Sequence, residues 1–372
     1  MSAHFLILLV DFLAGLLLGG GMIRMLLRIA YGNRIFDEPD ARKVHHVPVP
    51  RLGGMSFMPV IILVVALTIL ELYHMNLTSV HFFDNIHFVQ MTYMLVSAII
   101  LYVTGVTDDL SNLNYRVKLV AQFIASAVLV SSGAYIGNMY GLFGIHELPA
   151  YVGIPLTILL VMFITNAINM IDGIDGLASG ISIISLASIA MMFYVERKFV
   201  YVMIALITLG TVISFWLFNM FGKQEKRTKI FMGDTGSLTL GLILSYLIIN
   251  LGGFVGHRGL TTHRNIIYYT LVFSSLMIPL LDVVRLVFFR LSRHRSPFLP
   301  DMNHIHHIVM RCGLTARQTL WFLLASVIVI ILLNVLMSLA TWDVNLIFFV
   351  DLVLYVLWFW LINRRSKPLP ES

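Results

Sequence analysis

The chain alternates long apolar segments with short polar ones. Eleven segments, at about 20 residues each, are long enough to cross the hydrocarbon core of a bilayer as a helix. They lie near residues 4–27, 52–71, 90–107, 118–135, 151–170, 176–194, 199–220, 236–252, 265–290, 319–338 and 344–363. This pattern predicts an all-α polytopic membrane protein with about eleven transmembrane helices.

Composition favours helices in lipid over soluble domains. Hydrophobic residues make up 59% of the 372 positions and charged residues only 12%, against about 45–50% and about 25% in soluble domains. A single cysteine, Cys312, excludes a disulfide framework and a thiolate metal cluster. We therefore expect one integral-membrane domain over residues 1–363 and a short basic tail over 364–372.

Lysine and arginine indicate the orientation. If the connection after the first segment is cytoplasmic and the connections alternate, the cytoplasmic ones hold 19 basic residues and the outer ones 4. This asymmetry predicts an outer N-terminus and a cytoplasmic C-terminus. It also explains the net charge of +6 without a nucleic-acid partner. The first segment lacks a basic start and a cleavage site, so we expect it to remain a span and not a cleaved signal peptide.

The predicted cytoplasmic connections also gather acids and histidines on one face of the membrane. They carry Asp37, Glu38, Asp40, Asp108, Asp109, Asp172, Asp175, Glu225, Asp234, Asp301, His45, His46, His304, His306 and His307. A scaffold has no need of such a collection, whereas an enzyme acting on a charged substrate does. The sequence therefore predicts an active site on the cytoplasmic face.

Two adjacent acids, Asp108 and Asp109, close the third apolar segment. At a helix C-terminus they repel each other and face the negative end of the helix dipole. A divalent metal would compensate them, and a solvated acidic pair is an equally good reading.

The segment NAINMIDGIDGLA, residues 166–178, carries an amide or carboxylate at every third position. These are Asn166, Asn169, Asp172 and Asp175. Residues three apart share a helix face, so the pattern predicts a polar stripe at a membrane boundary. A site for a ligand or an ion explains this stripe better than a bland turn.

The segment FMGDTGSL, residues 231–238, opens the eighth apolar segment. Backbone N–H groups at a helix start bind anions, and Asp234 or Ser237 could cap the helix. Capping alone would explain Asp234. Phe231 could stack on a base, although an aromatic residue at this depth is often an interfacial anchor.

Three histidines, His304, His306 and His307, fall within DMNHIHH, residues 301–307. Since no second cluster of zinc-type ligands accompanies them, we interpret them as phosphate or sugar contacts or as acid–base groups. The many acids elsewhere favour a hard ion such as Mg²⁺.

Two further features have more than one reading. The loop FDEPDARKVHHVPVPRLGG, residues 36–54, mixes acids, bases and glycines; the ordinary positive-inside excess explains only its bases. Asp282 and Arg285 lie within the ninth apolar segment, three residues apart. Such a pair is either functional or an ion pair internal to the bundle.

Together these motifs resemble those of the polyprenyl-phosphate N-acetylhexosamine-1-phosphate transferases, which include the bacterial phospho-MurNAc-pentapeptide translocase. DEPDARKVHHVPVPRLGG, DDLSN, NAINMIDGIDGLA, FMGDTGSL and NHIHH occur in the order of that superfamily, over essentially the whole chain. Any one of them is moderately specific, and all five are very specific.

Within the superfamily the chain resembles the glycosyltransferase family 4 branch that primes O-antigen, common-antigen or teichoic-acid synthesis. The translocases have Gly-Thr-Pro-Thr-Met-Gly-Gly where this chain has PRLGG, residues 50–54, and three adjacent histidines where Ile305 intervenes here. The resemblance implies transfer of N-acetylhexosamine 1-phosphate from a UDP-sugar, most simply UDP-GlcNAc, to undecaprenyl phosphate, with release of UMP. It also implies Mg²⁺, for which Mn²⁺ could substitute, a bacterial inner membrane and a homodimer.

The resemblance assigns roles to matching positions. It implies metal ligands at Asp234 and Asp109, and catalytic residues at Asp108, Asp109, Asp172 and His304. It implies substrate-binding residues at Lys43, Arg51, Lys118, Asn169, Asp175, Phe231, His306 and His307. Among these, Asp175 and Phe231 match uridine-binding positions, and Lys43 and Lys118 match phosphate contacts. His304, His306 and Arg51 would face the sugar and diphosphate, Asn169 would lie near the metal, and Asp108 is the expected base.

Several alternatives remain open from the sequence. Direct attack by the lipid phosphate is preferred, and a two-step route through a carboxylate nucleophile is its rival. The translocase of peptidoglycan synthesis is the runner-up enzyme. A secondary transporter is the rival class, but transporters place their polar residues near the midplane, whereas here they crowd one surface.

Overall fold

The computed structural model describes residues 3–33, 35–36, 48–75, 85–251, 263–294, 296, 303–340 and 342–367. Helices dominate these residues, and an isolated β-bridge joins Asn138 to Glu147. The helices are α1 (Ala3–Asn33), η1 (Gly53–Ser56), α2 (Phe57–His74), α3 (Asn85–Ser111), α4 (Tyr115–Val130), η2 (Leu142–Gly144), α5 (Ala150–Ile171), α6 (Leu177–Val195), α7 (Phe199–Phe221), α8 (Gly233–Leu251), α9 (His263–Leu291), α10 (Ile305–Arg311), α11 (Ala316–Leu339) and α12 (Val344–Arg365). The prediction of an all-α fold is confirmed.

A helix occupies each of the eleven predicted apolar segments. Nine helices within the described residues are long and apolar enough to cross a membrane. The other two predicted segments correspond to α4, with 16 residues, and α9, with 29 residues. At 1.5 Å per residue α4 is about 24 Å long, shorter than a hydrocarbon core of about 30 Å. The chain is a multi-pass helical membrane protein, and the count of eleven spans stays a prediction.

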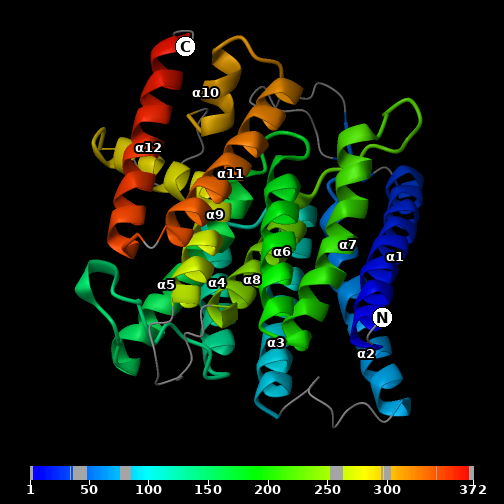
Figure 1. Ribbon diagram of the computed structural model, residues 1–372. Coiled ribbons are helices and arrows are strands. Elements are labelled where there is room, and N and C mark those ends of the chain that lie inside the picture. Colours follow the sequence, from blue (N-terminus) through cyan, green and yellow to red (C-terminus); the bar gives the residue numbers. More distant parts are fainter. Residues whose placement is uncertain are drawn as a thin grey trace.

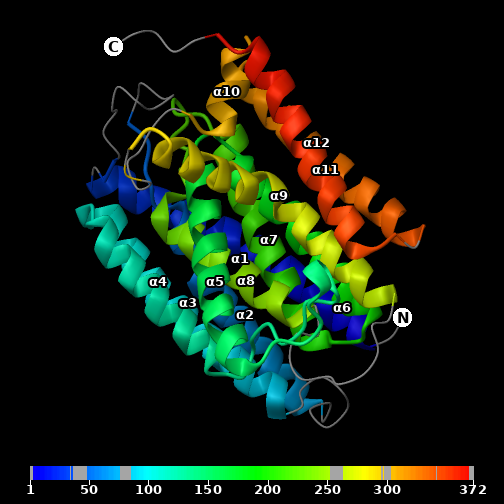
Figure 2. The same cartoon turned by 90° about the vertical axis from the view of Figure 1, so that its left-hand side faces the viewer.

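Helix α8 lies at the centre of the bundle, and every one of its residues is buried. Helices α3, α5 and α6 pack around it, α1 packs along α7, and α11 packs along α9. Helix α12 lies on the outside (Figures 1 and 2) and buries only three residues, Val344, Ile347 and Tyr355. The least apolar of the nine candidate spans is therefore shielded by protein on all sides.

Two glycines bring the neighbouring helices against α8. A Cβ on Gly105 of α3 would lie 2.3 Å from Thr235 Cα, and one on Gly241 of α8 would lie 2.7 Å from Thr165 Cα. Real Cβ atoms do not approach other atoms this closely, so only glycine permits these contacts. The end of α3, with its paired acids, is thereby held against the start of α8.

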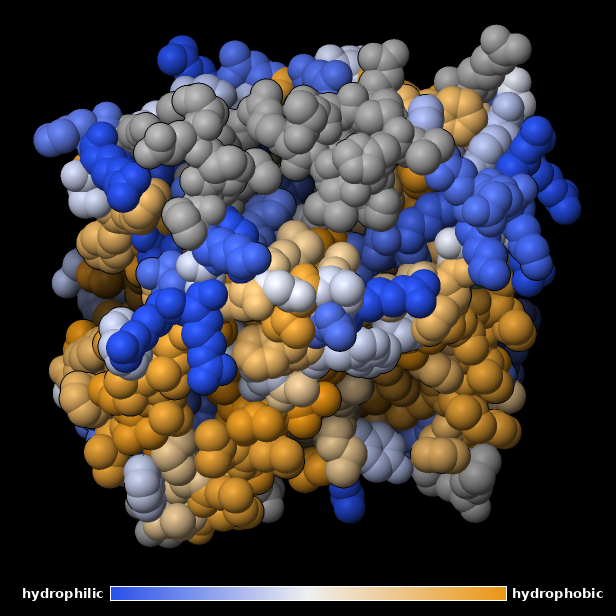
Figure 3. Space-filling view, turned by 90° about the horizontal axis from the view of Figure 1, so that it is seen from above, coloured by the Kyte–Doolittle hydropathy of each residue, from blue (hydrophilic) through white to orange (hydrophobic). Residues whose placement is uncertain are grey.

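The helix ends that carry the predicted motifs face the same end of the bundle, the upper end in Figure 1. This end includes α10, a seven-residue helix that the apolar pattern did not predict. Seen from above, hydrophilic residues gather across the upper half of the view, while apolar residues fill most of the lower half (Figure 3). Residues 37–47, which include the whole DEPDARK segment with Lys43, lie outside the described residues.

Candidate active site

The start of α8 is held by Asp109 at the end of α3. The Asp109 carboxylate accepts the N–H of Asp234 at 2.8 Å, the N–H of Thr235 at 3.0 Å and the Thr235 hydroxyl at 2.6 Å. These N–H groups belong to the first turn of α8, which has no partners for them within the helix. Asp109, on α3, therefore caps the N-terminus of α8 and fixes the position of the Asp234 backbone.

Lys118, in the first turn of α4, joins two of the predicted acids. Its Nζ lies 3.1 Å from Asp108 Oδ2 and 2.9 Å from Asp234 Oδ2. Both acids are about nine-tenths buried. Two buried carboxylates with oxygens directed at one point repel each other, and the shared ammonium compensates them.

A backbone strap places Arg51 beside the same acids. Gly53 N donates to Phe231 O at 2.9 Å, Gly54 N donates to Met232 O at 2.8 Å, and Phe231 N donates to Pro50 O at 2.8 Å. A Cβ on Gly54 would lie 2.1 Å from Gly236 N, which explains the glycine. The strap leaves Arg51 Nη2 3.8 Å from Asp234 Oδ1. PRLGG and FMGDTGSL thus form one structural unit.

Two residues of the polar stripe at the end of α5 bond to neighbouring helices, and a third, Asp172, is the C-cap residue. Asn166 Nδ2 donates to Gln122 Oε1 at 2.6 Å, and Asn169 Nδ2 donates to Ser237 Oγ at 2.8 Å. Asp172 is the C-cap residue of α5. Burial raises the pKa of Asp172 to about 7, with Arg51 opposing and Asp175, Asp234 and Asp109 adding to the rise. Asp172 is therefore ready to exchange a proton near neutral pH.

Asp175 is paired with Lys229, a lysine outside the recognised motifs. Lys229 Nζ lies 2.5 Å from Asp175 Oδ2 and donates to Asn219 O. Asn219 Nδ2 donates to Ile230 O at 2.9 Å, while its Oδ1 accepts the N–H of Gly176 at 2.6 Å. Asn219 thus ties the end of α7 to both the α5–α6 turn and the segment before Phe231. In the sequence, Asn219 could have been noticed only as a single amide within the apolar segment 199–220.

The three histidines lie at the start of α10. His304 is its N-cap residue, and the rings of His304 and His306 stack with centroids 5.8 Å apart. His306 is 2% exposed, and neither ring nitrogen has a hydrogen-bond partner. Burial and the neighbouring His307 and His304 lower the pKa of His306 well below its usual value. His306 is therefore neutral, with two unsatisfied nitrogens that a ligand could engage.

His306 connects α10 to the α5–α6 turn. A Cβ on Gly173 would lie 2.1 Å from His306 Nε2, so the ring occupies the space above this glycine. Gly173 follows Asp172 directly, and the histidines are thereby brought next to the acids of the turn.

The structure thus joins most predicted residues into three neighbouring groups. One group contains Asp108, Asp109, Asp234, Lys118, Arg51 and Asn169; another contains Asp175 and Phe231; the last contains His304, His306 and His307. Lys43 cannot be placed because it lies outside the described residues. Four further partners were not predictable from the motifs: Lys229, Asn219, Thr235 and Gln122. The positive-inside excess already explained the charge of Lys229, and each of the others meets its partner from a segment distant in the chain.

The donor atoms of this end suit a hard cation. Asp108 Oδ2 and Asp234 Oδ2 both face the position of one positive charge, the Lys118 ammonium. Magnesium in proteins takes one or two carboxylates and keeps several waters. Within the described part of the chain no group of three or more His, Cys, Asp or Glu side chains is placed to hold a metal. Asp108 and Asp234 therefore fit Mg²⁺, whereas the Asp109 carboxylate accepts three hydrogen bonds from the start of α8.

Comparison with known proteins identifies the family. The sequence model of glycosyl transferase family 4 matches residues 91–252, which contain most of the site. An undecaprenyl-phosphate alpha-N-acetylglucosaminyl 1-phosphate transferase of Salmonella typhi is 29% identical over 78% of this chain and 73% of its own length. A probable undecaprenyl-phosphate N-acetylglucosaminyl 1-phosphate transferase of Bacillus subtilis is 30% identical over 84% of this chain and 78% of its own. The chain belongs to glycosyl transferase family 4.

Proposed function

We propose that this protein transfers GlcNAc 1-phosphate from UDP-GlcNAc to undecaprenyl phosphate, giving undecaprenyl-diphosphate-GlcNAc and UMP. The reaction would take place at the cytoplasmic face of a bacterial inner membrane and prime a cell-surface polysaccharide. The observation that carries the proposal is the convergence of Lys118, Asp108 and Asp234 at one end of a membrane bundle. The names of the relatives support the transferred N-acetylglucosaminyl 1-phosphate group and the undecaprenyl phosphate acceptor.

The reaction exchanges one phosphoanhydride bond for another, so the protein mainly positions two anions and neutralises their charge. The acceptor phosphate oxygen attacks the phosphorus next to the sugar, and UMP leaves. Lys118 and Arg51 supply positive charge beside Asp234 and would bind the phosphates. Asp234 and Asp108 would hold Mg²⁺, which when bound neutralises the diphosphate and polarises its oxygens.

The two adjacent acids of α3 then have different tasks. Asp108 faces Lys118, where it could accept the proton of the acceptor phosphate before direct attack. Asp109 keeps the start of α8 in place through its three hydrogen bonds. A covalent intermediate on Asp109 would require it to release these bonds, which favours the direct route.

The donor would bind between the α5–α6 turn and α10. Asp175 and Phe231 lie on the two segments that Asn219 joins, and they would hold the uridine. His304, His306 and His307 would contact the sugar and diphosphate, with Asp172 beside them. The two unsatisfied nitrogens of His306 supply hydrogen-bonding capacity for this purpose.

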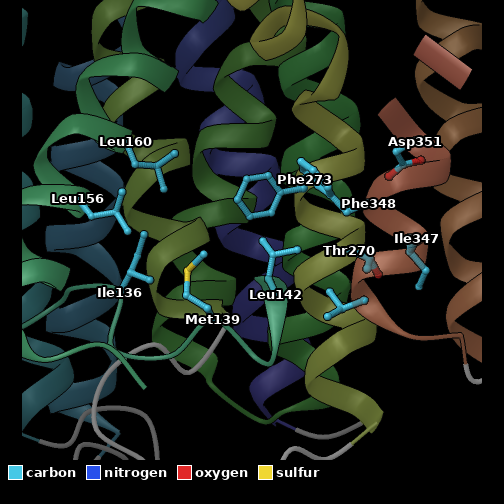
Figure 4. A pocket seen from close by; sticks show the side chains of 11 residues that line it. Ile136, Met139, Leu142, Leu156, Leu160, Thr270, Phe273, Ile347, Phe348 and Asp351 are labelled. Atoms are coloured by element: carbon cyan, nitrogen blue, oxygen red, sulfur yellow. The ribbon is translucent and has the colours of Figure 1, made fainter. Parts of the chain in front are cut away.

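The prenyl tail of the acceptor would lie along α9 within the bilayer. A cavity of about 380 Å³ opens between α9, α11 and α12, lined by residues such as Met277, Val329 and Trp358. A second cavity, of about 230 Å³, lies between α5, α9 and α12, where Leu160, Phe273 and Phe348 face one another (Figure 4). Both are almost wholly apolar, as a hydrocarbon chain requires.

The decisive experiment measures UMP release by the purified protein with undecaprenyl phosphate, Mg²⁺ and a panel of UDP-sugars. We expect UMP from UDP-GlcNAc and none from UDP-MurNAc-pentapeptide. Release from the pentapeptide donor alone would assign the chain to the translocase reaction. A folded protein that releases no UMP from any donor would refute the transferase proposal and favour a transporter.

A further inference from the structure

A buried carboxylate on α9 holds the start of α10. Asp282 is 1% exposed. Its Oδ1 accepts from Arg285 Nη2 at 2.7 Å and from the backbone N–H of Ile305 at 3.1 Å, and its Oδ2 lies 3.1 Å from His304 Nδ1. Arg285 Nη2 also donates to Asn303 O at 2.5 Å. The ion pair therefore makes three contacts with the segment Asn303–Ile305.

These contacts compensate for the weakness of α10 itself. A helix of seven residues is too short to be stable alone, since nucleation costs more than so few hydrogen bonds return. Its N-cap residue, His304, makes no capping hydrogen bond with its own side chain. Asp282 accepts the N–H of Ile305, the first residue of the helix, and so provides the cap from α9.

The same carboxylate determines the form of the His304 ring. A carboxylate oxygen can only accept, so Nδ1 must carry the proton in this contact. The other nitrogen, Nε2, then keeps its lone pair for the substrate side when the ring is neutral. A carboxylate behind a histidine is a recurrent way of fixing both tautomer and orientation.

From this geometry we infer that Asp282 is a positioning residue for the reaction, acting through His304. It holds the start of α10 through the N–H of Ile305, and it fixes the His304 ring through Nδ1, which leaves Nε2 for the substrate. Arg285 compensates the charge of Asp282 and stacks over Phe359, with its guanidinium carbon 4.6 Å from the ring centroid. The inference rests on the proposed function of the α10 histidines in binding the donor.

An ordinary ion pair inside the bundle would explain less. Charge compensation needs only the contact between Arg285 and Asp282. It does not explain why both partners also bond to the backbone around His304, or why the second carboxylate oxygen faces the imidazole. These additional contacts all converge on the turn that carries the histidines.

The test uses Asp282→Asn, His304→Ala and their combination in the full-length protein. We expect Asp282→Asn to lower kcat/KM for UDP-GlcNAc by about 10- to 100-fold, as loss of such supporting partners typically does. The KM for undecaprenyl phosphate should stay within about twofold. In the His304→Ala background, Asp282→Asn should add no more than about twofold, because residues that act through each other are not additive.

Asp11→Asn is the matched control. Asp11 is also a buried acid of a membrane helix, 2% exposed, but it lies in α1, far from α10 in the chain, and accepts the Thr68 hydroxyl of α2 at 2.5 Å. It should leave kcat/KM unchanged. The double variant Asp282→Asn/Arg285→Gln removes both charges and so leaves no unpaired buried charge. It tests the role of Asp282 even if Asp282→Asn alone folds poorly.

A second readout does not depend on turnover. In protein labelled with ¹⁵N-histidine, the His304 signal, assigned by its loss in His304→Ala, should report the Nδ1–H tautomer and change to a mixture in Asp282→Asn. An unchanged tautomer, or full additivity with His304→Ala, would overturn the inference. If the wild-type protein releases no UMP, the proposed function fails, while the tautomer measurement still decides the contact between Asp282 and His304.

Discussion

Asp109 and Asp234 lie 125 residues apart in the chain, yet the carboxylate of the first accepts the backbone N–H of the second at 2.8 Å. This bond separates the roles of two neighbouring acids. Asp109 turns toward the backbone of α8, whereas Asp108 turns toward Lys118. Loss of Asp109 should therefore affect the fold of the site, and loss of Asp234 should affect its chemistry.

Asp109→Asn should reduce both stability and turnover. An amide can accept only on one side, so one of the N–H groups of α8 faces an NH₂ group, at a cost of about 0.5–2 kcal/mol. Asp234→Asn should reduce turnover by at least about 100-fold. It should lower the melting temperature less than Asp109→Asn does, because Lys118 keeps Asp108 as a partner. Thermal unfolding and UMP release, measured on both variants, check this. Equal stability of the two variants would refute the capping role.

Lys118→Gln should bind a divalent cation more tightly while it turns over more slowly. Without the ammonium, Asp108 and Asp234 repel each other and attract a cation more strongly; a unit charge at about 4 Å is worth about 4 kcal/mol at an effective dielectric constant of 20. We expect the Kd for Mn²⁺, measured by electron paramagnetic resonance, to fall by about tenfold or more. Lys118→Arg keeps the charge and should leave this Kd unchanged. An unaltered Mn²⁺ affinity in Lys118→Gln would place the metal elsewhere.

Gly173→Ala should impair use of the donor. The new methyl group would lie 2.1 Å from His306 Nε2, so the ring must move. We expect kcat/KM for the UDP-sugar to fall by about tenfold or more, as displacement of a positioned group by about 1 Å can cost up to about 100-fold. Gly21→Ala in α1, where a Cβ meets nothing within 4 Å, is the control and should retain full activity. Normal donor kinetics in Gly173→Ala would exclude His306 from the donor site.

Asp172→Asn should stabilise the protein at alkaline pH. Burial raises the pKa of Asp172 from 3.8 to about 7, so the fold favours the protonated acid. As pH rises from about 4 to 7 the unfolded chain ionises first, and the stability of the folded state declines through this window. The gain in melting temperature from Asp172→Asn should therefore be larger at pH 8 than at pH 5, in metal-free detergent solution.

Asp343→Asn provides the opposite case. Asp343 is the exposed N-cap residue of α12, and its hydrogen bonds to Asn345 lower its pKa. Its stabilising contribution is fully present above the unfolded pKa of 3.8 and is lost as pH falls below it. Asp343→Asn should therefore cost the same at pH 8 and at pH 5, and less below about pH 4. The same pH response in both variants would contradict the environment assigned to Asp172.

The helices were predictable because each apolar segment had to satisfy its backbone internally in lipid. That constraint does not apply to α10, which lies outside the apolar segments and depends on Asp282 for its cap. The length of α4 was also misjudged: the prediction placed residues 118–135 in a span, but the helix ends at Val130. The turn Ser131–Gly133 is so short that it barely lowers the mean hydropathy of the surrounding segment. Hydropathy alone therefore does not show that the helix ends before it.

The site was predictable as a set of motifs but not as a set of contacts. The acids of α3, α5 and α8 stood out because charges at a membrane boundary are costly. Lys229 did not stand out, because the charge bias of cytoplasmic loops already explained it, yet it pairs with Asp175 from 54 residues away. Likewise, the sequence left Asp282 open between a functional and an internal pair, and only the position of His304 connects it to the site.

The complete enclosure of α8 has a consequence for how the protein is made. The start of α8 carries Asp234, Thr235 and Ser237, and its mean hydropathy is the lowest of the candidate spans. Inserting this helix alone into lipid would therefore be less favourable than inserting any other candidate span. Its main neighbours α3, α5 and α6 all precede it in the chain. When the ribosome completes α8 at Leu251, the three helices that pack around it have already been translated. The order of the helices along the gene thus matches the order in which the catalytic core can be assembled.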